Sequence, residues 1–194
     1  MRVTKEAAAE NRRKILETAT DLFKVKGFDN VSVADLTKAA GFSHGGFYNH
    51  FDSKAALAAQ AVRHAFEMAL SEISEDGPGE DATHMSDRLA SYLSAEHRDN
   101  PGAGCPTGSL PVDVGRSVPE AQEAYAEGLE RYIELIETVM PARAVDRRDV
   151  AIATLSRLVG ALVLSRAVRD GAPDLSDEIL RAASLRRDTL QDGS

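Results

Sequence analysis

A segment near residue 45 gathers small hydrogen-bonding groups of the kind that contact DNA. With the lysine that follows, they are Ser43, His44, Gly45, Gly46, Tyr48, Asn49, His50 and Lys54. Asparagine can pair in bidentate fashion with adenine, and histidine can donate to guanine N7 or to a phosphate. Hydroxyl and amine groups suit phosphate oxygens, which fix register without reading sequence. The predicted base-facing residues are His44, Gly45, Gly46 and Asn49. The predicted phosphate-facing residues are Ser43, Tyr48, His50 and Lys54.

Two short helices joined by a tight turn would present this segment. Ser32 and Asp35 have the spacing of a capping box, and Gly41 suits the left-handed exit of a helix. Ser43 can cap a second helix that runs to about His50. Apolar residues at helical spacing give both helices a buried side, and they are Val33, Leu36, Ala40, Phe47 and Phe51. The pattern predicts a helix-turn-helix, in which a buried first helix holds the second outward.

Gly45 and Gly46 make the second helix a poor one on its own, because each interior glycine costs about 1 kcal/mol relative to alanine. Some requirement other than helix propensity must keep them there. Close approach to another backbone, as in a DNA groove, is one such requirement.

These elements carry a resemblance to a known family. The residues that match are Asn11, Ile15, Leu16, Ala19, Leu22, Phe23, Gly27, Val33, Leu36, Ala40, Gly41, Ser43, Gly45, Phe47, Tyr48, His50, Phe51, Ser53, Lys54 and Leu57. Over about its first third, without a gap, the chain closely resembles the DNA-binding domain of TetR-family transcriptional regulators. It departs at His44, where many relatives carry Lys or Arg, and at Gly46, where many carry Ser, Thr or Ala. The resemblance implies a homodimeric regulator, usually a repressor on a palindromic operator, that a small ligand releases from DNA.

The distribution of charge agrees with DNA binding although the net charge is −8. Residues 1–64 contain ten Lys/Arg and seven Asp/Glu, which gives a charge of +3. Residues 65–194 contain thirteen Lys/Arg and twenty-four Asp/Glu, which gives a charge of −11. DNA would attract the first part and repel the second, which helps to orient the molecule. The N-terminus is polar and lacks the apolar stretch of a signal peptide, so a cytoplasmic location is expected.

The 194 residues predict an all-α fold, because no segment alternates with the period of a strand. The expected helices beyond the helix-turn-helix span residues 11–26, 54–74, 83–97, 110–114, 119–140, 149–169 and 176–190. Residues 1–53 are predicted to form a three-helix DNA-binding domain, with the helix at 54–74 as connection. Residues 75–194 are predicted to form a C-terminal helical bundle for ligand binding and dimerisation.

Two further sites are expected in the C-terminal bundle together with the connecting helix at 54–74. Bulky residues on inward faces are the candidate walls of an effector pocket: Phe66, Met85, Leu89, Tyr92, Leu110, Tyr125, Leu129, Tyr132 and Leu158. They favour a small, largely apolar or aromatic ligand. The apolar helix at 150–168 and the last helix are expected to form a two-fold dimer interface through Leu155, Leu158, Val159, Leu162, Val163, Ile179 and Leu180.

Other chemistries find little support. The glycines at 102, 104 and 108 follow no strand and do not have the dinucleotide spacing. His84 and His97 lack metal-ligand spacing, so no metal or cofactor is expected. Cys105 leaves open a helical enzyme or a redox sensor, although no partner motif for catalysis accompanies it. A DNA-binding architectural protein without an effector is the second alternative. The prediction is a regulator and not an enzyme.

Overall fold

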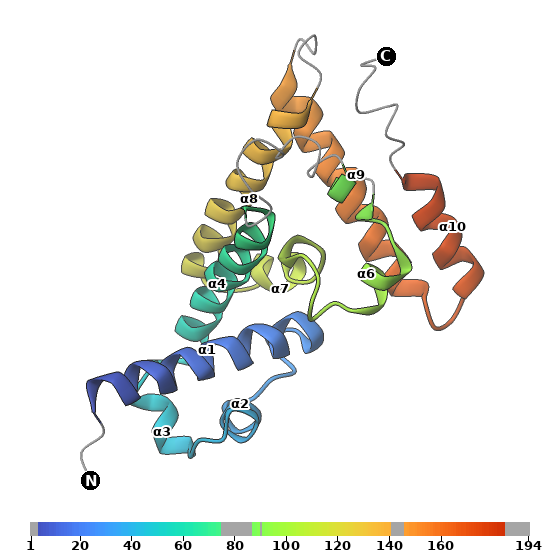
Figure 1. Cartoon of the computed structure of the whole chain (residues 1–194). Coiled ribbons are helices and arrows are strands. Elements are labelled where there is room, and N and C mark those ends of the chain that lie inside the picture. Colours follow the sequence, from blue (N-terminus) through green and yellow to red (C-terminus); the bar gives the residue numbers. More distant parts are fainter. Residues whose placement is uncertain (1–3, 75–86, 90, 141–145, 185–194) are drawn as a thin grey trace. The chain divides into compact units, whose positions relative to one another are not determined.

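The computed structural model describes residues 4–74, 87–89, 91–140 and 146–184, and every regular element in these ranges is helical (Figure 1). The all-α prediction is confirmed. The elements are α1 Lys5–Lys26, α2 Val33–Ala40, α3 His44–Tyr48, α4 Lys54–Ser74, α6 Ala95–Asp99, the 3-10 turn η1 Pro106–Gly108, α7 Pro111–Gly115, α8 Pro119–Val139, α9 Arg147–Val168 and α10 Pro173–Ala183.

The chain divides into two compact units. The first unit comprises Met1–Met68 and Ser109–Gly128, and the second comprises Ala69–Gly108 and Leu129–Ser194. The division falls within α4 and within α8, so each of these helices contributes residues to both units. The segment at 109–128 therefore groups with the N-terminal helices, although it is distant from them in sequence.

Helix α1 begins earlier than the expected start at residue 11. Thr4 caps it by accepting a hydrogen bond from the Ala7 amide at 3.2 Å, and Arg13 pairs with Glu10 and Glu17 on its surface. The expected start at residue 11 was therefore wrong, because the helix already includes residues 5–10. The alanines at the start of α1 have high helix propensity, although they form no apolar stripe.

The helix-turn-helix forms as predicted. Ser32 and Asp35 make both bonds of the capping box, and Gly41 adopts φ 78° and ψ 33° in the left-handed region. Phe28 packs back on α1, with its ring centroid 5.0 Å from that of Phe23. Both Phe47 and Phe51 are buried, so one side of α3 is anchored in the core of the first unit.

In the second unit, the helix expected at 83–97 is interrupted. Residues 92–93 form a turn, and Ser94 caps the separate helix α6 by accepting from the His97 amide at 3.1 Å. The apolar positions kept their spacing across the turn, which is why the pattern alone did not reveal it. Residues 83–86 and 90 lie outside the described ranges. Helix α10 starts at Pro173, three residues before the expected start, since proline fits the first helical turn.

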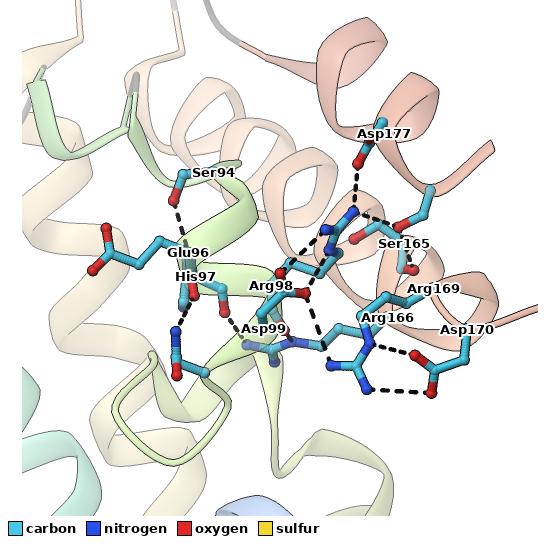
Figure 2. A network of polar contacts seen from close by, with 12 residues as sticks. Ser94, Glu96, His97, Arg98, Asp99, Ser165, Arg166, Arg169, Asp170 and Asp177 are labelled. Carbon is cyan, nitrogen blue, oxygen red and sulfur yellow. Dashed lines mark hydrogen bonds and ion pairs between the residues drawn. The ribbon is translucent and has the colours of Figure 1, made fainter. Parts of the chain in front are cut away.

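Two arginines hold the segment around α6 against α9 and α10 (Figure 2). Arg166 donates to the backbone carbonyls of His97 and Gly108 at 2.6 and 2.8 Å, and burial lowers its pKa. Arg98 is buried and donates to Ser176 Oγ at 2.9 Å and to Asp177 at 2.6 Å. Leaving a buried guanidinium without acceptors would be costly, so these bonds fix the position of α6.

Helix α9 is the one described helix that is long and apolar enough to span a membrane. One-third of its most apolar window is buried inside the protein, and core helices of soluble proteins have the same length and composition. The helix is thus only weak evidence for a membrane location.

Candidate nucleic-acid interface

Helix α3 is short and is fixed at both ends. Ser43 has extended backbone angles and accepts a hydrogen bond from the Gly46 amide at 3.2 Å. The helix ends at Tyr48, two residues before the expected end at His50. The reason is a tight turn in which the amides of His50 and Phe51 both donate to the Phe47 carbonyl, at 2.9 and 3.1 Å. The predicted N-cap is therefore confirmed, and the predicted length was wrong.

Apart from Lys54 of α4, the predicted contact residues belong to α3 and the residues next to it, where Phe47 is buried. Tyr48 is 53% exposed although its ring meets that of Phe47 edge-on at 5.1 Å. Gly45, Asn49 and Ser43 are exposed, whereas Gly46, His50 and Lys54 are half-buried. His44 begins the helix, and its side chain lies outside what the structure describes.

The two glycines of α3 have different surroundings. A Cβ on Gly46 would lie 3.3 Å from Ser43 Oγ, so the capping arrangement itself leaves little room there. A Cβ on Gly45 would meet no atom within 4 Å, and its φ is not positive. Nothing in the described part of the chain therefore explains a glycine at position 45, which agrees with a requirement imposed by an external partner.

Lys54 stands in the first turn of α4. Ser53 caps this helix by accepting from the Ala56 amide at 3.0 Å. The N-terminal amides of a long helix attract phosphate, and the lysine adds a full positive charge at the same end. This arrangement suits a phosphate contact that fixes orientation.

Two basic residues of α1 take part in supporting the helix-turn-helix, which the sequence did not predict. The Arg12 guanidinium stacks 4.6 Å from the Phe51 ring centroid and donates to Gln60 of α4. Lys14 Nζ lies 6.0 Å from the centroid of Phe42 in the turn before α3. Both contacts depend on tertiary structure, and no local sequence signal distinguishes these residues from solvated surface.

The predicted effector residues are divided between the two units. Phe66, Leu110 and Tyr125 belong to the first unit, and the rings of Phe66 and Tyr125 meet edge-on at 5.3 Å. The second unit contains Leu89, Tyr92, Leu129, Tyr132 and Leu158. Met85 lies outside the described residues.

A buried polar cluster in the second unit joins some of these residues. Tyr92 Oη lies 3.2 Å from Thr107 Oγ1, and Cys105 Sγ lies 2.9 Å from the same hydroxyl. Burial is the main cause that raises the pKa of Tyr92 and of Tyr132, so both hydroxyls stay protonated. Sequence reasoning named the two tyrosines but missed Thr107, which has no exposed surface and no motif around it.

The predicted dimer residues fall into two groups. Leu155, Leu158, Leu162 and Leu180 are buried within this chain, while Val159, Val163 and Ile179 are half-buried. The large apolar side chains that α9 and α10 expose most are Leu164 at 59% and Leu175 at 47%. Among the described residues, no group of three or more His, Cys, Asp or Glu side chains could hold a metal ion.

The geometry defines a helix-turn-helix protein with a second helical unit. Residues 15–61 match the family described as bacterial regulatory proteins, tetR family, which agrees with the resemblance found in the sequence. The repressor DhaR of Mycobacterium sp. (strain GP1) is 31% identical over 106 residues, which cover 53% of this chain and 52% of DhaR. The regulator AcrR of Shigella flexneri is 41% identical over 56 residues, 29% of this chain and 26% of AcrR. The matches thus span about half or less of these relatives, and those named are regulators and not enzymes.

Solved structures share the fold over most of the chain. A TetR-family regulator from Cytophaga hutchinsonii has a TM-score of 0.75 at 19% identity, covering 98% of this chain and 96% of its own. A regulator from Saccharomonospora viridis in complex with choline has a TM-score of 0.68 at 23% identity, covering 90% of this chain and 95% of its own.

Proposed function

We propose that this protein is a transcriptional repressor that binds a palindromic operator as a homodimer and leaves it when a small molecule binds. The observation that carries the proposal is the exposed side of α3, where Gly45 faces open space and Tyr48 and Asn49 are exposed beside it. On this proposal His44, Gly45, Gly46 and Asn49 meet base edges. Ser43, Tyr48, His50 and Lys54 meet phosphates.

The charge of the chain supports this orientation. The positive excess lies within residues 1–64, which include α3 and the start of α4, and the remaining residues are strongly acidic. The DNA-binding domain is assigned to residues 1–53 and the effector and dimer functions to residues 75–194. The location that fits operator DNA is the cytoplasm.

The effector proposed is small and largely apolar or aromatic. Tyr92, Tyr132 and Thr107 supply neutral hydroxyl groups in a buried setting, which can orient a ligand without demanding charge. Solved structures of the same fold include a Bacillus subtilis regulator in complex with stearoyl-CoA and the choline complex, so different regulators of this fold accept different ligands.

If these residues contact DNA as proposed, their substitution should weaken DNA binding in two different ways. Tyr48→Ala and Lys54→Ala should weaken binding to all duplexes and lower the slope of log K against log salt by about 0.9 for each phosphate contact removed. Asn49→Ala should instead relax the preference at one base position, since a bidentate base contact is worth about 1–3 kcal/mol of discrimination. Binding is measured by fluorescence anisotropy on an operator selected from random DNA and on scrambled duplexes.

Lys26→Ala is the matched control, because Lys26 is an exposed lysine at the C-terminal end of α1. It should leave the salt slope unchanged. Equal losses for Lys26→Ala and Lys54→Ala would mean that the effect is one of overall charge and not of a contact at α4.

The dimer assignment predicts that a charge at position 164 separates the subunits. Leu164→Glu places a carboxylate on the exposed side of α9 without removing a core residue, since Leu164 is 59% exposed. Leu158 and Leu162 have no exposed surface, so charges there would report on folding and not on assembly. Light scattering should show a dimer for the unmodified protein and a monomer for Leu164→Glu. Val25→Glu, at a 56% exposed position on α1, should remain dimeric.

A further inference from the structure

Asp113 of α7 reaches the connection between α1 and α2. Its Oδ1 accepts a hydrogen bond from the Phe28 amide at 2.8 Å. The carboxylate lies across Gly27, where an added Cβ would be 2.8 Å from Oδ1 and 3.2 Å from Oδ2. Gly27 has φ 78°, so a glycine at this position provides both the backbone conformation and the room for the carboxylate.

The C-terminal end of α1 does not need this hydrogen bond as a cap. The Gly27 amide already bonds to the Phe23 carbonyl at 2.9 Å, so the helix has its own cap. A carboxylate near a helix C-terminus opposes the helix dipole, and such positions favour cations. Asp113 does suit the first turn of α7, but its bond to the Phe28 amide links residues 85 apart in sequence. The bond therefore constrains where the helix-turn-helix lies relative to α7.

Two more contacts fasten the segment at 109–128 to the N-terminal helices within the first unit. Arg63 of α4 pairs with Glu127 of α8 at 3.2 Å. Phe66 of α4 is buried against Tyr125, and Gly128 leaves room for its ring. Helix α8 then continues without a break past Gly128 into the second unit and ends at Val139. A displacement of α8 would thus reach α7 and, through Asp113, the connection between α1 and α2.

We propose that Asp113 is a positioning residue that transmits the state of the second unit, by way of α8 and α7, to the helix-turn-helix. The inference rests on the proposed function, since it concerns how DNA binding is regulated. Coupling between two sites is reciprocal, so DNA binding must in turn affect the segment at 109–128 through the same contact. This reciprocity makes the proposal testable without knowledge of the effector.

The test uses hydrogen–deuterium exchange of the full chain with and without an operator duplex selected from random DNA. Asp113→Asn and Asp113→Leu both keep the branched side-chain shape, but only the asparagine keeps an oxygen that can accept from Phe28. In the unmodified protein and in Asp113→Asn, the operator should slow exchange about threefold or more in peptides from both 43–54 and 109–128. In Asp113→Leu, the slowing should persist at 43–54 and disappear at 109–128. Val112→Ala, at an exposed position beside Asp113, should behave as the unmodified protein.

The outcomes separate this inference from the function on which it rests. If the unmodified protein binds no selected DNA and peptides from 43–54 do not respond, the proposed function fails. If 43–54 responds but 109–128 does not, or if 109–128 responds equally in Asp113→Leu, the proposed role of Asp113 is wrong. If Asp113→Leu does not fold, Asp113→Ser replaces it, because the shorter hydroxyl cannot reach the Phe28 amide from the same backbone position.

Discussion

Gly128→Ala is expected to lower the free energy of unfolding by about 2 kcal/mol and the melting temperature by about 4–8 °C. The added Cβ would lie 2.2 Å from Cγ of Phe66 and within 2.5 Å of both Cδ atoms, which is far inside van der Waals contact. The ring cannot easily retreat, since Phe66 is 2% exposed and packs edge-on against Tyr125. Alanine's better helix propensity offsets about 1 kcal/mol of the strain at most. Thermal unfolding followed by circular dichroism gives the midpoint.

A double-mutant cycle identifies the cause of this loss. Phe66→Leu in the Gly128→Ala background should recover part of the lost stability, although Phe66→Leu alone is destabilising. Gly115→Ala is the matched control, because a Cβ there would meet no atom within 4 Å in the same unit. Additive effects of Phe66→Leu and Gly128→Ala would mean that the ring adjusts freely and that the close packing does not limit stability.

Features that depend on a few neighbouring residues were predictable from the sequence. The capping box of Ser32 and Asp35, the left-handed Gly41 and the burial of Phe47 and Phe51 all formed as expected, because each has a local physical cause. The same holds for α7 and α8, where proline stands at or near the first helical position. Local chemistry therefore accounts for the elements that present α3.

The ends of helices were less predictable, since several local solutions compete there. The tight turn after Tyr48 shortens α3, and the cap by Ser94 interrupts a helix whose apolar spacing runs on across it. In each case a serine cap or a shared carbonyl acceptor outweighs the apolar periodicity. A period of 3.6 residues indicates which residues are buried, but it does not show whether the helix is continuous.

Contacts between residues far apart in sequence could not be predicted at all. The pairs Asp113 and Phe28, Arg12 and Phe51, and Tyr92 and Thr107 have no sequence motif that would join them. These contacts determine how the helix-turn-helix is held and which polar groups meet in the second unit. The helix-turn-helix elements were therefore predictable from the sequence, whereas the contacts that support them were not.

Gly45→Ala is expected to weaken operator binding by roughly 5- to 100-fold while leaving the protein at least as stable as before. Within the chain the added methyl group meets no atom within 4 Å, and alanine favours a helix by about 1 kcal/mol over glycine. On DNA the same methyl group would enter a close-packed interface, where overpacking costs about 1–3 kcal/mol. A variant that folds better and binds worse cannot be explained by damage to the fold.

The measurement pairs thermal unfolding with titration of the selected operator. Gly115→Ala serves again as control, because it also adds a methyl group in open space on a helix of the first unit and should change neither operator affinity nor its salt dependence. Gly46→Ala should differ from Gly45→Ala in stability, because its Cβ would lie 3.3 Å from the capping Ser43 Oγ. Unchanged operator affinity in Gly45→Ala would place this side of α3 away from the DNA, and the assignment of Gly45 and Asn49 to base edges would be wrong.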